Sequence, residues 1–117
     1  MSTRVLIVDD HPTFRATARL LLETEGFLVI GEAEDGMSAI AKATELAPDL
    51  VLLDVNLPDI DGFDVSSRIT AVDGAPLVVL TSSRDPSEFG PLVRRSGARG
   101  FVPKDELSGA SLQSLVS

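Results

Sequence analysis

The sequence predicts an α/β domain with a doubly wound parallel sheet, on the basis of three observations. Short apolar runs of strand length recur along the chain, and stretches with helical periodicity lie between them. The strongest runs consist of consecutive Val, Leu and Ile, which is typical of strands buried on both faces. Strands and helices alternate with short connections, so we expect one parallel sheet with helices on both of its faces.

Five segments are predicted as strands. Three are strong, at residues 5–8, 50–53 and 77–80, and two are weaker, at residues 28–30 and 101–102. Pro103 closes the last segment, and proline cannot donate a hydrogen bond to a central ladder. The fifth strand is therefore expected at an edge of the sheet.

The first three helices are predicted from apolar stripes at helical spacing. These stripes are Phe14, Ala18, Leu21 and Leu22 in the first, Met37, Ile40, Ala41 and Ala43 in the second, and Val65, Ile69 and Val72 in the third. Pro48 ends the second helix and Gly74 ends the third, since neither residue type suits a helix interior.

The fourth helix is predicted from its capping pattern. Asp85 is a suitable N-cap, Pro86 suits the first turn, and Glu88 stands three residues after the cap. Gly90-Pro91 is expected to kink or restart this helix. A short fifth helix is predicted over residues 108–116.

Composition limits the classes of function. The 117 residues suit one domain, covering 1–117, and 18 acidic against 10 basic side chains give a formal charge of −8. The absence of cysteine excludes disulfides, iron–sulfur clusters, thiolate zinc sites and cysteine nucleophiles. No apolar run has the length of a membrane span or a signal peptide, so we expect a cytoplasmic protein without a membrane partner. The acidic balance argues against nucleic-acid binding by this segment.

Polar residues stand where the predicted strands end. They are Asp9 and Asp10 after the first strand, Asp54 after the third, Thr81 after the fourth and Lys104 after the fifth. Ligands of open α/β sheets bind beyond these carboxyl ends. Three clustered carboxylates need a cation, and with no Cys and one His the best fit is Mg²⁺. A metal, an ammonium and a hydroxyl around a carboxylate suit phosphoryl transfer onto that carboxylate.

Several stretches of this chain resemble one known family. They are Val8-Asp9-Asp10-His11-Pro12, Asp54-Val55-Asn56-Leu57-Pro58-Asp59-Ile60-Asp61-Gly62, Leu80-Thr81-Ser82 and Gly100-Phe101-Val102-Pro103-Lys104-Asp105. In order and spacing they resemble the receiver domain of bacterial two-component response regulators, over nearly the whole chain. The resemblance implies a flavodoxin-like, CheY-like sheet in the order 2-1-3-4-5 with five helices. The sequences of these motifs are most similar to those of receivers attached to LuxR-type (NarL-type) helix-turn-helix domains.

The resemblance also implies a role for each site residue. It implies a signalling domain rather than an enzyme, with intrinsic phosphotransfer and autodephosphorylation chemistry. Asp54 is expected to accept a phosphoryl group from a phosphohistidine on a sensor histidine kinase. The expected Mg²⁺ ligands are Asp9, Asp10, Asp54 and the main-chain carbonyl of Asn56, and the expected phosphoryl ligands are Thr81 and Lys104.

Readout is expected to run through Thr81 and Phe101. The phosphoryl charge would attract the Thr81 hydroxyl, and Phe101 would then move from an exposed to a buried rotamer. The expected docking face for a second copy or an output domain comprises the fourth helix, the fifth strand and the fifth helix. A buried edge-strand aromatic is an alternative interpretation of Phe101. For His11 we expect a loop-lining role rather than metal or phosphate binding.

Other interpretations use the same residues. A phosphatase of the haloacid-dehalogenase type also has a strand-end aspartate, but it typically carries an acidic residue two positions later, where this chain has Asn56. A degenerate receiver would act as a protein-binding module. A receiver itself is either stand-alone or the N-terminal part of a transcription factor, and we expect the second, with a DNA-binding domain beyond Ser117.

Overall fold

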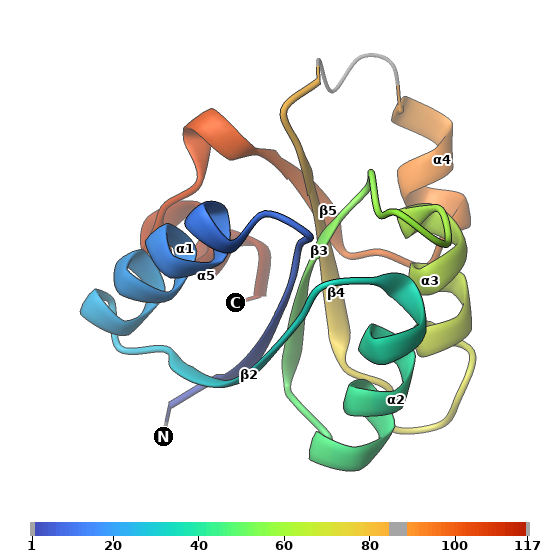
Figure 1. The fold of residues 1–117 in the computed structure, drawn as a ribbon, viewed down its shortest axis with the longest axis horizontal. Helices are drawn as coiled ribbons and strands as arrows, with labels where there is room; N and C mark the ends of the chain where they lie inside the picture. The colour runs from blue at the N-terminus through green and yellow to red at the C-terminus, as the bar shows by residue number, and fades with distance from the viewer. Residues whose placement is uncertain (1, 85–88, 117) are drawn as a thin grey trace.

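Five parallel strands form one sheet in the order β2-β1-β3-β4-β5 (Figure 1). The structure is a computed structural model that describes residues 2–84 and 89–116. The strands are Arg4–Val8 (β1), Leu28–Ala33 (β2), Leu50–Asp54 (β3), Leu77–Ser82 (β4) and Gly100–Pro103 (β5). The predicted fold class and strand order are confirmed, and β5 lies at an edge as its proline predicted.

Helices cover both faces of the sheet. In the described ranges they are Pro12–Thr24 (α1), Gly36–Leu46 (α2), Gly62–Thr70 (α3), Gly90–Arg95 (α4) and Gly109–Val116 (α5), with a short 3-10 turn at Lys104–Glu106 (η2). The helices α1 and α5 pack on one face, and α2, α3 and α4 on the other (Figure 1). The side chains of alternate residues in the central strands therefore project into two separate apolar cores, one under each layer of helices.

Four residues of the predicted apolar stripes are exposed, and Ala41 is one of them. The other three, Leu21, Met37 and Val72, have exposed fractions of 38%, 59% and 63%. The buried face of α2 is formed by Gly36, Ala39 and Ala43, so Met37 points elsewhere. Val72 lies beyond the end of α3 at Thr70, where the helical spacing no longer applies. The stripes located the helices correctly but wrongly assigned these four side chains to the buried core.

The fourth helix begins at Gly90 in the described part of the chain. Pro91 occupies its first turn, which agrees with the predicted restart at Gly90-Pro91. The predicted capping by Asp85, Pro86 and Glu88 lies outside the described residues.

The start of α3 is fixed directly behind the end of β3. The Asp61 carboxylate accepts a hydrogen bond of 2.7 Å from the N–H of Phe63, which caps the helix. A Cβ at Gly62 would lie 2.4 Å from the main-chain oxygen of Asp54, so only glycine permits this approach. The Gly62 N–H also donates to Val55 O at 2.8 Å. These contacts tie the start of α3 to the main chain at the end of β3, next to Asp54.

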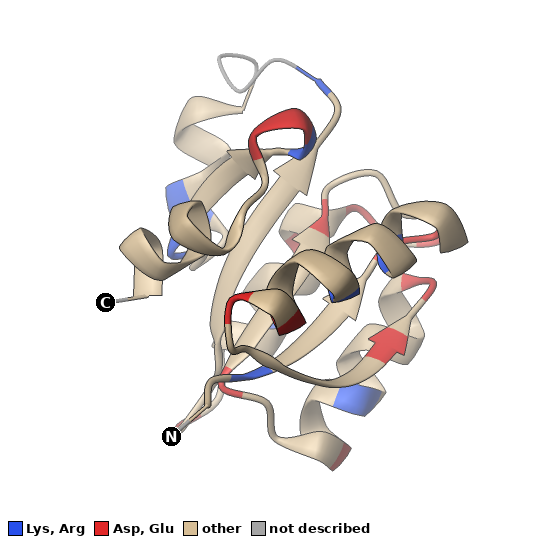
Figure 2. Ribbon diagram, turned by 90° about the vertical axis from the view of Figure 1, so that its left-hand side faces the viewer, with Lys and Arg blue, Asp and Glu red and all other residues tan. Residues whose placement is uncertain are grey.

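Charged residues are spread over the chain rather than gathered in one block. Figure 2 shows acidic and basic segments distributed over several helices and loops on the side that carries α1 and α5. None of the helices in the described ranges combines the length and apolar character that crossing a bilayer requires.

Candidate functional site

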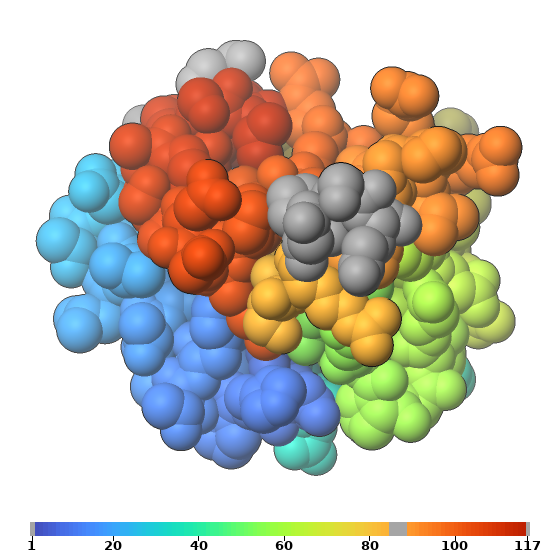
Figure 3. Space-filling view, turned by 90° about the horizontal axis from the view of Figure 1, so that it is seen from above, coloured from blue at the N-terminus to red at the C-terminus, as the bar shows by residue number. Residues whose placement is uncertain are grey.

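The candidate site lies at the carboxyl end of the sheet. Segments that follow β1, β3, β4 and β5 meet at this end of the molecule (Figure 3). Parallel strands in one sheet all present their carboxyl ends on the same side, which is where open α/β sheets bind ligands. The predicted convergence of strand-end residues is therefore a property of this fold.

Three carboxylates are gathered there, and two of them are buried. Asp9 follows β1 and is fully buried, whereas Asp54 is the last residue of β3 and is 2% exposed. Asp10 is exposed at the rim. The main-chain N–H of Asp9 donates to Ala33 O of β2 at 3.0 Å, which anchors the segment after β1. Buried carboxylates without a cation are costly, so this site requires positive charge.

Lys104 supplies one positive charge directly after β5. Its Nζ lies 2.7 Å from Asp9 Oδ2 and 3.5 Å from Asp54 Oδ2. The same ammonium lies 4.4 Å from the centre of the Phe14 ring on α1, a cation–π contact that helps to fix its position. One lysine thus faces two buried carboxylates and offsets their charge only in part.

The charges and burial at the site shift the pKa of Asp54. Burial and then the negative charge of Asp9 raise the pKa of Asp54 to about 6, against an ordinary value of 3.8. Lys104 and the N–H of Asn56, which donates to Asp54 Oδ1 at 3.2 Å, act in the opposite direction. A carboxylate held in this way gains from any further positive charge that enters the site.

Thr81 stands beside Asp54 on the neighbouring strand. The two residues are paired in the register between β3 and β4, so their side chains project to the same side of the sheet. The Thr81 side chain is fully buried, yet within the described residues its Oγ1 has no hydrogen-bond partner. Asp9 Oδ2 likewise accepts no aligned hydrogen bond there, despite its ion pair with Lys104. Buried polar atoms are normally hydrogen-bonded, so both of these atoms have capacity for a further partner.

Asn56 and Phe101, which the sequence predicts as site residues, differ in what they contact. Asn56 follows Asp54 by two residues, and its Nδ2 lies 3.5 Å from Ser82 Oγ. Phe101 is half-buried in β5 and packs against Phe89, with ring centres 5.6 Å apart. Phe101 therefore contacts the start of α4 rather than the carboxylates.

Two further side chains reach this group: Arg15, which the sequence did not predict here, and His11, for which it predicted a loop-lining role. Arg15 of α1 donates from Nη1 to Asp9 O at 2.6 Å and from Nε to Glu32 Oε1 at 3.0 Å. His11 Nδ1 lies 2.9 Å from Asp9 Oδ1 and 3.0 Å from Asp10 Oδ1. No local pattern in the sequence indicates that the Arg15 side chain reaches the main chain before its helix.

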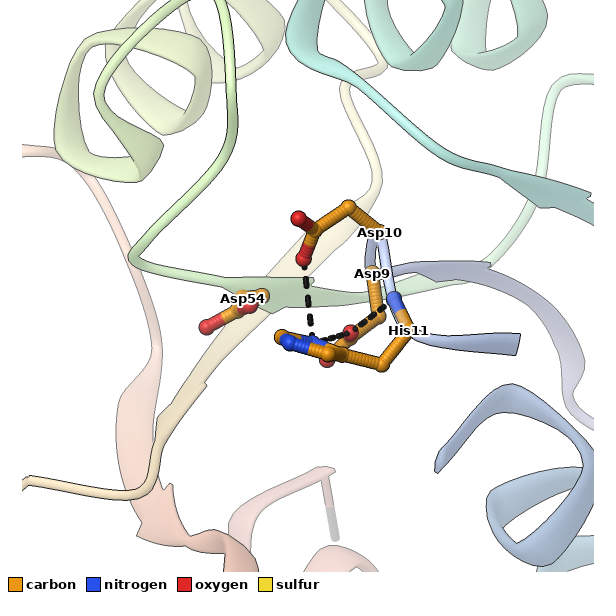
Figure 4. A group of neighbouring side chains, drawn as sticks. All are labelled: Asp9, Asp10, His11 and Asp54. Carbon is orange, nitrogen blue, oxygen red and sulfur yellow. Dashed lines mark hydrogen bonds and ion pairs between the residues drawn. The ribbon is translucent and has the colours of Figure 1, made fainter. Parts of the chain in front are cut away.

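The donor set suits a divalent cation. Asp9, Asp10, His11 and Asp54 each offer one ligand atom, and these atoms lie within 4.8 Å of one another (Figure 4). Carboxylate oxygens are the ligands that Mg²⁺ prefers, and the buried atoms without partners leave capacity for one. The residues therefore fit the Mg²⁺ that the sequence predicts at this end of the sheet.

Comparison with known proteins agrees with this geometry. The family described as response regulator receiver domain matches residues 5–116. The chain is similar to BvgA of Bordetella pertussis, a positive transcription regulator of virulence factors, with 45% identity over 107 residues, 91% of this chain and 51% of BvgA. A protein of Pseudomonas aeruginosa named as a transcriptional regulator is 41% identical over 104 residues, 89% of this chain and 50% of that protein. The chain thus spans about half the length of these curated relatives.

Solved structures give the same assignment. The signal receiver domain of NarL from Mycobacterium tuberculosis has a TM-score of 0.87 and 32% identity, covering 97% of this chain and 96% of that one. A LuxR-family two-component response regulator from an Aurantimonas species has a TM-score of 0.84 and 31% identity, covering 97% of this chain and 81% of that one. Because the family matches all but the first four residues and the last, the chain belongs to the response regulator receiver domains of two-component signalling.

Proposed function

We propose that Asp54 is the phosphoacceptor of this receiver domain and that a sensor histidine kinase is its donor. The observation that carries the proposal is the buried position of Asp54 at the end of β3, where it faces Asp9 and Lys104. An oxygen of Asp54 attacks the phosphorus of a phosphohistidine, the P–N bond breaks, and the imidazole of the kinase leaves. The domain is a signalling component whose product is its own aspartyl phosphate.

Each neighbour of Asp54 has a role in this proposal. Asp9, Asp10, Asp54 and the main-chain carbonyl of Asn56 hold Mg²⁺, which when bound neutralises charge on the transferring phosphoryl group. Lys104 Nζ, at 3.5 Å from Asp54 Oδ2, pairs with a phosphoryl oxygen. The Thr81 hydroxyl, which has no hydrogen-bond partner among the described residues, donates to another phosphoryl oxygen. Both residues therefore stabilise charge that appears only when the phosphoryl group arrives.

Labelling with a small phosphodonor tests this assignment. Wild-type protein incubated with acetyl phosphate and Mg²⁺ is expected to gain one phosphate by intact mass, and Asp54→Asn none. Asp73→Asn, in an exposed turn after α3, is the matched control and should label like the wild type. Full labelling of Asp54→Asn would show that another residue is the acceptor. Unchanged labelling in EDTA would exclude the metal role.

The output of the switch is proposed to pass through Thr81 and Phe101 to the face formed by α4, β5 and α5. Two observations support this route: Thr81 pairs with Asp54, and Phe101 packs against the residue before α4. The curated relatives are transcription regulators about twice as long as this chain. We propose that a DNA-binding output domain completes the protein in the cytoplasm and that this face contacts it or a second copy.

Amide exchange with and without beryllofluoride tests the output route. Changed protection over residues 98–104 and α5 is expected, in addition to the loops around Asp54. Changes confined to those loops would favour a domain that does not transmit phosphorylation in this way, such as a constitutive binding module. The size of the complete gene product would separate a stand-alone receiver from the proposed transcription regulator.

A further inference from the structure

Three Asp-Gly pairs occur in the chain, at residues 35–36, 61–62 and 73–74. In such a pair the main-chain nitrogen of the glycine can attack the side-chain carboxyl carbon of the aspartate, because glycine has no Cβ to obstruct the approach. A five-membered succinimide ring forms, and its hydrolysis gives either aspartate or isoaspartate. The three pairs share this chemistry, so the fold decides which of them reacts.

We propose that Asp73-Gly74 is a site of isoaspartate formation in the folded protein, and that the fold protects the other two pairs from the same reaction. Water is the one co-reactant. The proposal does not rest on the proposed function, because the turn that carries Asp73 precedes β4 and lies at the end of the sheet opposite to Asp54 (Figure 1).

The reaction is balanced without an oxidant or a second substrate. A bond forms between Gly74 N and Asp73 Cγ, while the amide proton and the carboxyl hydroxyl group leave together as one molecule of water. Water then opens the ring. If the bond between Gly74 N and Cγ breaks, Asp73 is restored. If the bond between Gly74 N and the main-chain carbonyl carbon breaks, the chain continues through Cγ, and the former main-chain carbonyl becomes a free carboxylate.

At Asp35-Gly36 the attacking nitrogen and the carboxylate are both held by hydrogen bonds. The Gly36 N–H donates to Asp59 Oδ1 at 2.7 Å. The Asp35 carboxylate accepts from the N–H of Ser38 at 2.8 Å and caps α2. Gly36 is buried, and a Cβ on it would lie 2.9 Å from a methyl carbon of Val65. Ring closure would break these hydrogen bonds and move closely packed main chain.

Asp61-Gly62 is restrained in the same two ways. The Gly62 N–H donates to Val55 O at 2.8 Å, and the Asp61 carboxylate accepts from the N–H of Phe63 at 2.7 Å. Gly62 is also buried, and a Cβ on it would lie 2.4 Å from Asp54 O. The reaction at this pair requires local opening of the start of α3, so its rate is reduced to the fraction of molecules that are open.

Asp73-Gly74 has none of these restraints. Both residues are exposed in the turn between α3 and β4. Within residues 2–84 and 89–116, the Asp73 carboxylate and the Gly74 N–H have no hydrogen-bond or ion-pair partner. Gly74 has a φ of +75°, and a Cβ built on it would meet no heavy atom of another part of the chain within 4 Å. The main chain can therefore rotate to bring Gly74 N onto Asp73 Cγ without displacing a packed neighbour.

Isoaspartate at position 73 would change the surface around this turn. It lengthens the main chain by one atom and moves the negative charge from the side chain to the former main-chain carbonyl. Asp73 lines a groove between α2 and α3, together with Ile40, Ile69 and Val72. The modification therefore alters the rim of this groove.

Ageing of the full chain in H₂¹⁸O tests the proposal, because each ring hydrolysis leaves one solvent oxygen on the aspartyl residue. After transfer to ordinary water, trypsin places the three pairs on three separate peptides, residues 20–42, 43–68 and 69–84. In the folded protein we expect heavy oxygen to accumulate on Asp73 at least about ten times faster than on Asp35 or Asp61. Peptide 69–84 should also give a second chromatographic form of the same composition, which contains isoaspartate.

Two controls separate the effect of the fold from that of the sequence. In urea the three pairs should label at comparable rates, since no hydrogen bond or packing then protects two of them. Asp73→Glu keeps the charge at this exposed position, but its longer side chain would have to close a less favourable six-membered ring. The label and the second form of peptide 69–84 should therefore disappear in this variant. Equal labelling of the three pairs in the folded protein, or a second form that persists in Asp73→Glu, would overturn the proposal.

Discussion

Lys104 lies closer to Asp9 than to the proposed phosphoacceptor Asp54. Its Nζ is 2.7 Å from Asp9 Oδ2 and 3.5 Å from Asp54 Oδ2. The lysine therefore compensates Asp9 first, while burial and then the charge of Asp9 raise the pKa of Asp54. This order leaves Asp54 as the carboxylate that benefits most from an arriving cation, and it leaves Lys104 close enough to bind a group added to Asp54.

Removing the charge of Lys104 should destabilise the protein at neutral pH. In Lys104→Met, two buried carboxylates lose their shared partner, so we expect a loss of about 1–3 kcal/mol in the free energy of unfolding. The loss should shrink as the pH falls below 6, because protonation of Asp54 removes one of the charges. Urea unfolding at several pH values measures both effects. Lys104→Arg keeps the charge and should retain more of the stability.

Asp54 makes the stability depend on pH in a defined direction. Its pKa in the folded protein is about 6, above the ordinary 3.8, so between these values the folded state holds more protons than the unfolded state. Stability therefore falls as the pH rises from about 4 to about 6, and the cost persists at higher pH. With solvent screening taken into account, we expect a cost of about 1–2 kcal/mol.

Asp54→Asn should accordingly be more stable than the wild type at neutral pH in EDTA, by that same amount. The difference should be small near pH 4 and should disappear below about pH 3, where Asp54 is protonated in both states. Urea unfolding of the two proteins across this range is the measurement, with the exposed Asp73→Asn as control. A constant difference at all pH values would mean that the substitution changes packing rather than charge.

Mg²⁺ should stabilise the wild type through the native state alone. A free concentration ten times the dissociation constant adds about 1.4 kcal/mol to the free energy of unfolding. Asp10→Ala removes an exposed proposed ligand while leaving the buried carboxylates in place, so its melting temperature should respond much less to Mg²⁺. Calorimetric melting with Mg²⁺ and with an equal ionic strength of NaCl separates binding from screening. Equal shifts in both proteins would contradict a specific site.

The sequence predicts the elements and the strand-end residues well because both depend on short-range patterns. Once alternating strands and helices imply a parallel sheet, Asp9, Asp54 and Lys104 must share one end of it. Contacts between side chains of different helices, strands and loops leave no short-range pattern in the sequence. The guanidinium of Arg15 on Asp9 O and the position of His11 depend on loop geometry that the sequence does not express.

The N-terminus of α2 illustrates this limit and gives another prediction. Asp35 caps the helix from its own N-cap position, by accepting from the N–H of Ser38 at 2.8 Å. Asp59, from the loop after β3, also binds there: its oxygens accept from the N–H groups of Gly36 at 2.7 Å and Met37 at 3.0 Å. These bonds, that from Gly36 foremost, hold the pKa of Asp59 below its usual range.

Asp59→Ala should therefore weaken α2 and the loop that carries Asn56 together. We expect a lower melting temperature, faster amide exchange at Gly36 and Met37, and slower phosphorylation of Asp54. Asp35→Ala is the matched control, since it removes a cap of the same helix without touching that loop. If both variants slow phosphorylation equally, Asp59 acts only through helix stability.

Phe89 should couple the movement of Phe101 to α4. Phe89 is buried, precedes α4, and packs between Phe63 at 5.5 Å and Phe101 at 5.6 Å, measured between ring centres. Any new rotamer of Phe101 must displace this ring, because packed rings leave no free volume. Truncation in Phe89→Ala should cost about 3–5 kcal/mol if the cavity stays open, so Phe89→Leu is the safer variant for measuring coupling.

With Phe89→Leu we expect beryllofluoride still to protect the loops around Asp54. The change in amide exchange over residues 90–95 should be clearly smaller than in the wild type, since the smaller side chain follows Phe101 less closely. Phe63→Leu, on the far side of the same ring contact, is the control and should retain the response in β5. If Phe89→Leu transmits the change to α4 in full, the signal reaches that helix through the main chain after β4 and not through the aromatic rings.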